Sequence, residues 1–456
     1  MFRFWMFRIW LTLFLLVFTL ARAQGAQQNG GLDDALFGDG AGNATNENLN
    51  TNANSGDDLF GAQNSFVSAA GASTANPAAD LLTSETVTLG GDFRLTADLE
   101  LALNPEEDED TFTSGLLDLK TRLFLDARPS RDFRTFVKGD VAYSTVNGVS
   151  LALREVFADV SVADTVFVRA GKQTVNWGVG RFFSPANLIN LETIDPEDPD
   201  AELSGPVAIK AQLPLGTDNA TGYLLLDDIE TGDDIGLAGR YELLLEGYEL
   251  TVGGLYRSNR PWAVMSTATG AVRGLTVFGE VVLEGDSDKV FVVENGDLPL
   301  DTAVSDSLLV SGTLGAQYRV TTEDDLYTVT GSAQYFFNGL GYEDTSVFTD
   351  DPAAIGTLLQ EGKIGVSDLT ARGRHYAAAT LSSPDIAKTD LTPNAFWLGN
   401  LSDGSGQAEV SLEHSGVKNL IPSVSYSYAY GAVGAEHSPR GKRHMLKMAL
   451  EVSGSF

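Results

Sequence analysis

Two pairs of polar residues lie at equal distances from one position in the chain. A hairpin turn centred on Asp164 would place Glu155 opposite Gln173. The same turn would place Asp159 opposite Arg169, with all four side chains on one face of the hairpin. Cross-strand pairs of opposite charge stabilise such hairpins. We interpret Asp159 and Arg169 as a structural ion pair, with contact to a passing polar solute as the alternative.

An aromatic segment follows this hairpin directly. Beyond Gln173 the chain reads TVNWGVGRFFSPANLIN, in which Trp177, Phe182 and Phe183 are large apolar rings. Rings of this size are poorly placed on a solvated loop, and Gly178 and Pro185 indicate a turn. We expect the segment to pack against another part of the protein. The next stretch is acidic and could attract cations, although such a run is more often a solvated loop. Its acids are Glu192, Asp195, Glu197, Asp198, Asp200 and Glu202.

Catalytic and metal-binding patterns are absent from the sequence. The four histidines form no metal-spaced pair of the HExxH kind, and the chain contains no cysteine. They are His375, His414, His437 and His444. No residue near His375 or His444 is marked as a nucleophile by its neighbours. The glycines around residue 178 form no phosphate-binding loop, because no strand-to-helix unit surrounds them. We therefore expect no enzyme activity, no cofactor and no metal site.

The elements that must position these residues are long amphipathic strands. Residues 86–103 alternate between apolar and polar side chains, and the pattern recurs at 116–127, 133–144, 308–319 and 327–337. This alternation has the period of a β-strand, and it is longer than most strands of soluble domains. Charges of both signs on the polar face suit a water-filled lumen. The pattern predicts an all-β fold, a transmembrane antiparallel up-and-down β-barrel of about 18 strands, with 16 as the alternative.

Aromatic residues and connection lengths give the predicted barrel an orientation. Aromatics gather near strand ends, at residues 335–337 and at Tyr426, Tyr428 and Tyr430, as in an interfacial girdle. Short periplasmic turns and long outer loops are the rule for such barrels. We predict short turns at 127–133, 162–165, 213–220 and 320–326, and long links at 104–114, 175–204, 258–271 and 338–371. The least certain predicted strand is 289–294.

The N-terminal region indicates export. Residues 1–23 have two early arginines, an apolar stretch and the sequence Ala21-Arg22-Ala23, which is typical of a secretory signal peptide. Residues 24–83 are rich in Gly, Asn, Ala and Gln, so we expect a disordered periplasmic tail or a partial plug. The barrel domain is then 84–456. Export without cysteine suits the outer membrane of a bacterial cell.

The charge balance narrows the range of partners. The chain has 62 acidic and 30 basic residues and a formal net charge of -32. Nucleic acid is an unsuitable partner, because binding it requires basic patches that displace counterions. Beyond residue 23 there is no apolar run long enough for a membrane-spanning helix, so a membrane location requires a closed barrel.

Two stretches resemble the porin-like barrels of Gram-negative bacteria. One is 153–190, described above. The other is the C-terminal strand MLKMALEVSGSF, in which Val452 and Phe456 share the apolar face. The resemblance implies that the barrel-assembly machinery reads this strand as a signal. It also implies that the loop at 175–204 folds inward and narrows the pore. The constriction candidates are then Trp177, Arg181, Phe182, Phe183 and Asn187, and the lumen charge candidates are Glu155, Asp159, Arg169 and Gln173.

Three functions are compatible with these observations. The first is a porin or channel for passive passage of small hydrophilic solutes. The second is a transporter for hydrophobic solutes, because Asn76-Pro77-Ala78-Ala79 resembles the N-terminal region of fatty-acid channels. The third is a non-conducting structural or adhesive barrel. Each would contact outer-membrane lipid, and a homo-oligomer is possible. In the first reading the aromatic segment either narrows the pore or only attaches the loop to the wall.

Overall fold

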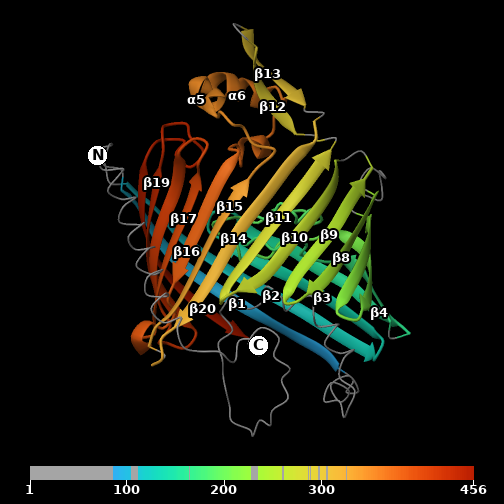
Figure 1. Ribbon diagram of the computed structural model, residues 1–456. Helices are drawn as coiled ribbons and strands as arrows, with labels where there is room; N and C mark the ends of the chain where they lie inside the picture. Colours follow the sequence, from blue (N-terminus) through green and yellow to red (C-terminus); the bar gives the residue numbers. More distant parts are fainter. Residues whose placement is uncertain are drawn as a thin grey trace. The chain divides into compact units, whose positions relative to one another are not determined.

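The fold is a closed antiparallel β-barrel of 18 strands (Figure 1). The computed structural model describes residues 86–103, 111–163, 165–226, 235–258, 261–285, 287, 289–295, 298–304, 307–324 and 326–456. The barrel strands are β1 (Thr86–Leu103), β2 (Thr111–Ser130), β3 (Phe133–Ser144), β4 (Gly148–Val162), β5 (Val166–Lys172), β6 (Val207–Leu215), β7 (Asp218–Leu226), β8 (Ile235–Leu245), β9 (Tyr248–Arg257), β10 (Trp262–Val272), β11 (Leu275–Gly285), β14 (Leu309–Thr321), β15 (Thr328–Phe337), β16 (His375–Ser382), β17 (Leu391–Asn400), β18 (Ser405–His414), β19 (Leu420–Tyr430) and β20 (Arg443–Ser455). The predicted fold class and strand number are confirmed.

Each barrel strand pairs with its neighbours along the chain, and β20 closes the ring against β1. The last residue takes part in this closure. The Phe456 N–H donates to the Gly91 carbonyl at 2.9 Å, and the Gly91 N–H donates to the Phe456 carbonyl at 3.0 Å. Val452 lies opposite both Leu95 and Leu420. Pairing with β1 thus continues to the last residue, and pairing with β19 reaches Val452, so β20 closes the ring between two neighbours. Reading of this strand by the assembly machinery stays a prediction.

The apolar faces of the strands point outward. On β1, Leu89 and Leu99 are exposed on the outer face. Asp98, whose side chain points to the inner face, is buried. The same contrast holds on β11, where Val281 is exposed and Glu280 is buried. A membrane-spanning barrel needs this arrangement, because lipid replaces water on the outer surface.

Two predicted boundaries were wrong. Residues 258–271 were expected to be a long link, but β10 occupies Trp262–Val272 as a barrel strand. The inward side chains of β10 include the apolar Ala263 and Met265, which the 173–206 segment covers. The two faces of β10 therefore differ little in polarity, and the alternation that marks the other strands is weak. The strand expected at 289–294 is not a barrel strand, because β12 (Val290–Asn295) pairs only with β13 (Leu298–Val304) in a separate two-stranded sheet.

The two ends of the barrel differ in their connections. At the end of the barrel where β1 starts and β20 ends, the connections are short, as in the turns Glu246-Gly247 and Arg273-Gly274. Both residues of each of these turns have positive φ, which matches the right-handed twist of the flanking strands. A 3-10 turn, η2 (Ile386–Lys388), lies in one longer connection at this end. The opposite end carries the longer links 173–206 and 338–374.

The link 338–374 folds together with the β12–β13 hairpin. It contains α5 (Ser346–Asp350), α6 (Pro352–Gln360) and η1 (Val366–Leu369). Pro352 is the first residue of α6, and the Asp351 carboxylate caps the helix by accepting the Ala354 N–H at 3.0 Å. The Ser346 N–H donates to the Asp344 carboxylate and lowers the pKa of Asp344. The apolar core of this unit is Val292, Val347, Phe348, Ile355, Leu358 and Ile364.

No helix among the described residues is long and apolar enough to cross a membrane. The signal peptide expected at 1–23 and the tail or plug expected at 24–83 lie outside the described residues. Asp164, on which the predicted hairpin turn was centred, also lies outside them.

Candidate functional site

The segment 173–206, which we call the inner segment, joins β5 to β6 and reaches a distant part of the wall. Its main contact there is the buried carboxylate of Glu280 on β11. The donors to this carboxylate are the N–H groups of Val179 (2.5 Å), Gly180 (2.5 Å) and Ala186 (2.8 Å) and the Ser184 hydroxyl (3.0 Å). Backbone donors that converge on one charged acceptor form strong hydrogen bonds.

A second anchor lies on β15. The Gln334 Oε1 atom accepts the N–H groups of Phe182 at 2.8 Å and Arg181 at 3.1 Å. Its Nε2 group donates to the Phe183 carbonyl at 2.5 Å and to Thr313 Oγ1 at 2.6 Å. The side-chain amide therefore uses both its acceptor and its donors, three of the four bonds going to the inner segment.

Two glycines permit this close approach. A Cβ atom at Gly178 would lie 1.6 Å from Ser184 Oγ and 2.7 Å from a Glu280 carboxylate oxygen. A Cβ atom at Gly180 would lie 1.9 Å from the Phe183 carbonyl oxygen. Larger residues at either position would push the segment away from the two anchors.

The predicted aromatic residues pack against the wall. Trp177 is 2% exposed and meets Tyr223 edge-on, with ring centroids 5.8 Å apart. Phe182 is fully buried in a cluster with Ala378 on β16 and Leu398 on β17. Phe183 stacks on Phe336 at 5.1 Å and also contacts Tyr376. On the other side of the turn, the inner segment and β6–β11 share one apolar cluster, whose members include Val175, Trp177, Ile189, Tyr223, Leu225, Met265 and Val282.

The remaining constriction candidates are polar and only partly buried. The Arg181 guanidinium pairs with Asp200 at 3.2 Å, within the inner segment itself. The Asn187 N–H donates to the Ser184 carbonyl at 3.1 Å. The Asn187 side-chain oxygen accepts from Asn190 at 2.9 Å. Both residues therefore make contacts within the inner segment itself.

Replacing Phe182 by alanine tests the aromatic attachment. Removing a fully buried ring should lower the free energy of unfolding by roughly 3–5 kcal/mol, because the cavity cannot collapse completely. Urea unfolding in detergent micelles, followed by tryptophan fluorescence, measures this change. The control is Phe133→Ala, which removes a ring exposed on the outer face. Equal losses in the two variants would contradict a specific role for Phe182.

The lumen charge candidates take the following places. Asp159 lies opposite Arg169 in the β4–β5 pair, and Arg169 donates to its two carboxylate oxygens at 2.7 and 3.1 Å. Glu155 accepts from the Thr174 N–H at 3.2 Å and pairs with Lys138 at 3.1 Å. Gln173 is buried and donates to the Ala208 carbonyl at 3.1 Å. The four residues thus lie at the base of the inner segment.

The acidic stretch of the inner segment reaches a charged part of the wall. Glu202 pairs with Arg122 on β2 at 3.1 Å and with Lys138 on β3. Further along the ring, Gln407 on β18 donates to Glu197 at 3.3 Å. Glu202 is therefore not a solvated loop residue, since it joins the segment to the wall. The wall charges of β1–β5 and β20 that form ion pairs include Arg94, Asp98, Lys120, Arg122, Asp126, Arg134, Lys138, Asp140, Arg154, Asp159, Arg169, Lys447 and Glu451.

Contacts with β2 and β3 on one side and with β11 and β15 on the other place the inner segment inside the ring. In a closed barrel, one short segment can touch both sides only through the interior. The chain is a closed 18-strand β-barrel with a segment folded into it.

Solved structures that resemble this barrel share little sequence with it. No protein-family model matches the chain, and no curated protein matches it. Among solved structures, OccK5 (OpdH) of Pseudomonas aeruginosa is 9% identical, covers 82% of this chain and 98% of its own, and has a TM-score of 0.47. OccD3 (OpdP) of the same organism is 11% identical over 82% and 92%, with a TM-score of 0.47. A mutant porin of Rh. blastica is 9% identical over 81% and 100%, with a TM-score of 0.41. These likenesses are too distant to assign a family or a solute.

Several residues of this site were not singled out from the sequence. Glu280 and Gln334 are the main anchors, and Asp140 gathers Lys120, Arg122 and Arg154. One signal was available for Glu280, because it stands between the apolar Phe278 and Val282 on the same face of its strand. Gln334 carried no comparable signal. Among the described residues, no group of three or more His, Cys, Asp or Glu side chains could hold a metal ion.

Proposed function

We propose that this chain is an outer-membrane porin for passive passage of small hydrophilic solutes, with the inner segment as its constriction. The observation that carries this proposal is the segment's double attachment to Glu280 and Gln334, across the barrel from its own strands. A barrel of 18 strands is wide enough for an aqueous channel unless something fills it. A segment held across the lumen is the part that sets the remaining opening.

The solute path in this proposal runs beside the charged wall. The apolar side of the inner segment packs against β6–β11 and against β16 and β17, which fills that part of the lumen. The strands β1–β5 and β20 instead carry ion-paired side chains of both signs. A wall of charged and hydrogen-bonding groups favours polar solutes over apolar ones, because a polar solute keeps polar partners along the path.

The test is single-channel conductance of the refolded chain in a planar bilayer, beside a variant that lacks residues 177–190. Discrete conductance steps that become larger in the deletion are expected. The deletion exposes apolar wall residues such as Leu225 and Met265, so its strand content is checked first by circular dichroism. If it does not fold, the anchor variants described in the Discussion serve instead. Absence of conductance in the folded wild-type protein would contradict the porin proposal and favour a non-conducting barrel.

The alternative of a transporter for hydrophobic solutes depends on a plug within residues 24–83, which lie outside the described residues. No observation on the described barrel favours it. Uptake of a fatty acid by vesicles, without conductance, would be the result that supports it.

A further inference from the structure

Three phenyl rings form a row on the inward face of the wall strands β2, β3 and β4. The ring centroids of Phe124 and Phe136 are 6.2 Å apart, and those of Phe136 and Phe157 are 5.3 Å apart. Phe136 lies directly opposite Phe157 in the β3–β4 pair. We call these three residues the phenyl row. The interior of a barrel that holds water is lined mainly by polar side chains, so adjacent apolar rings there require a physical reason.

Contacts of neighbouring residues place the phenyl row in the lumen. On β2, Phe124 stands two residues after Arg122, whose guanidinium pairs with Glu202 of the inner segment at 3.1 Å. On β3, Phe136 stands two residues before Lys138, which pairs with the same Glu202. Residues two apart on a strand share a face. Both rings therefore point to the side on which the inner segment lies.

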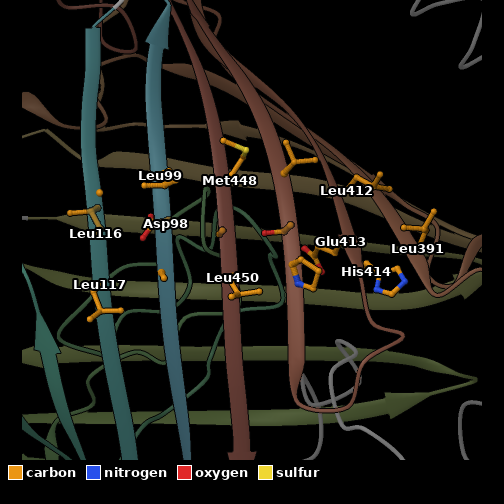
Figure 2. Close-up of a pocket in the computed structure, with 16 residues that line it drawn as sticks. Asp98, Leu99, Leu116, Leu117, Leu391, Leu412, Glu413, His414, Met448 and Leu450 are labelled. Atoms are coloured by element: carbon orange, nitrogen blue, oxygen red, sulfur yellow. The ribbon is translucent and has the colours of Figure 1, made fainter.

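The positions between these residues point outward and are apolar. Leu123 on β2, Val137 on β3 and Val156 on β4 are all exposed. Figure 2 shows another part of this outer face, where Leu99 of β1 and Leu117 of β2 border an apolar hollow. The alternation of the two faces is thus unbroken here, and the rings are part of the inner one.

The phenyl row does not attach the inner segment to the wall. The apolar clusters that do so are built with β6–β11 and with β16 and β17, and in the described part of the chain they include none of the three rings. Along β2, Phe124 lies between the ion pair of Arg122 with Glu202 and the short β2–β3 connection. A solute that has passed the inner segment from the long-loop end therefore meets the row next.

A chain of ion pairs runs beside the phenyl row. The Asp126 carboxylate accepts two N–H groups from Arg128, at 3.0 and 3.3 Å, and two from Arg134, at 2.9 and 3.1 Å. Arg134 also pairs with Asp159 at 3.6 Å, and Asp159 accepts from Arg169 at 2.7 Å. Four hydrogen bonds use the lone-pair sites of one carboxylate. Asp126 therefore holds two guanidinium groups in fixed positions.

Two guanidinium groups of this chain lie over rings of the phenyl row. The Cζ atom of Arg134 is 5.0 Å from the ring centroid of Phe136, and that of Arg169 is 3.8 Å from the centroid of Phe157. These are cation–π distances. Phe157 is only 6% exposed, so this end of the row is largely covered.

The end of the row that is open to a solute lies at Phe124. Its ring is half-buried, and among the described residues no cation lies over it. Arg128 folds back along β2 to Asp126, the next inward position after Phe124. The Arg128 side chain is 39% exposed and uses two of its five N–H donors on Asp126, so donors remain for a ligand.

Charges that are already paired favour a neutral ligand over an ionic one. A carboxylate ligand would have to compete with Asp126 and Asp159 for the same guanidinium groups. A cationic ligand would have to displace those groups from the two acids. A hydroxyl group instead uses the remaining N–H donors and breaks no pair. A hexopyranose whose hydroxyls are equatorial has such groups around its edge and C–H bonds on its flat faces, which match the apolar face of a phenyl ring.

We infer that the phenyl row and Arg128 bind a neutral hexopyranose, so that sugars are a solute class of the channel. The inference rests on the proposed function, because it takes the ligand to be a solute that passes through the lumen. In this site Phe124 contacts the C–H face of the sugar, and Arg128 donates to its hydroxyl groups. Asp126 is a positioning residue, since it fixes the guanidinium.

Saturation-transfer NMR on the refolded full chain in deuterated dodecylphosphocholine micelles tests this contact, with methyl β-D-glucopyranoside as the probe. Saturation of the aromatic protons should transfer to the C–H protons of the sugar. The variant Phe124→Leu/Phe136→Leu retains apolar side chains but removes two flat rings, so the affinity should fall roughly tenfold. The control Phe93→Leu/Phe133→Leu removes two rings from the outer face and should bind the sugar as the wild type does.

The charge argument is tested by Asp126→Asn. This change frees Arg128 and Arg134 from their shared carboxylate, so binding of the glucoside should weaken and binding of methyl β-D-glucuronide should strengthen. A merely structural role of Asp126 would weaken both. The control Asp118→Asn removes the same charge from the same strand, nearer its start, and should leave the preference for the glucoside unchanged.

Several results would overturn the inference. These are absence of transfer in the folded wild type, equal loss of binding in the ring variant and its outer-face control, and a wild type that prefers the glucuronide. Strand content is checked by circular dichroism, and Phe124→Leu alone replaces the double variant if that does not fold. The NMR experiment requires no bilayer, so it is separable from the porin proposal. Sugar binding by a barrel that does not conduct would support the site and contradict the porin proposal, and conductance without sugar binding would do the reverse.

Discussion

Glu280→Ala is expected to release the inner segment from β11, so that single-channel conductance increases and becomes noisier. Four donors converge on this buried carboxylate, and all lose their acceptor in the variant. Hydrogen bonds to a charged group contribute about 1.5–3 kcal/mol each, although water entering the site offsets part of the loss. We therefore expect the free energy of unfolding to fall by roughly 3 kcal/mol or more. Planar-bilayer recordings and urea unfolding measure the two effects.

Graded variants make this prediction specific. Glu280→Gln retains the shape and one acceptor oxygen, but it places an NH₂ group against N–H donors, so its effect should be intermediate. Glu409→Gln is the control, because Glu409 lies on the wall strand β18 and accepts no hydrogen bond from the described part of the inner segment. If Glu280→Ala and Glu409→Gln change conductance equally, the anchor does not set the opening.

Glu202→Gln is expected to make the channel more selective for anions. Glu202 neutralises Arg122 on β2 and Lys138 on β3, and both cations would then face the lumen with less compensation. The reversal potential in a salt gradient measures the change, which should be larger at low ionic strength because exposed charges are screened by salt. Stability should change by only about 1 kcal/mol or less, since these side chains are partly solvated.

The control for this prediction is Glu192→Gln. Glu192 belongs to the same acidic stretch and accepts the Ser204 N–H at 2.8 Å, but no ion pair joins it to a described cation of the wall. Both changes remove one negative charge, so only the difference between them reports on the bridge to β2 and β3. A shift toward cations in Glu202→Gln, or equal shifts in both variants, would refute the proposed role of the bridge.

The inner segment is held on two sides of the lumen, by Glu280 and Gln334 on one side and by the ion pairs of Glu202 on the other. Glu280 and Gln334 hold its turn against one side of the lumen, where Trp177 and Phe182 are buried. The inner segment is therefore attached to one part of the wall by its aromatic residues, and its acids contact the opposite part. This combines the two interpretations that the aromatic segment allowed, with attachment on one side and narrowing, as we propose, on the other.

The sequence by itself determined the barrel. A period of two, repeated in long amphipathic strands, requires one lipid-facing and one inward-facing side wherever the strands lie in the ring. Local pairing also followed from spacing alone, because Asp159 and Arg169 belong to consecutive strands joined by a short turn. The amphipathic C-terminal strand ending in Phe456 closes the ring against β1.

Only the tertiary structure decided what crosses the lumen. Glu280 and Gln334 lie about a hundred residues or more along the chain from the N–H groups that donate to them. No local sequence pattern could therefore link either residue to the inner segment. Strand β10 was missed because its inward residues Ala263 and Met265 are apolar, and apolar residues suit this position because the inner segment covers them. The polarity of an inward position depends on whether water or protein lies against it. That depends on the path of a loop through the closed ring, which strand periodicity does not encode.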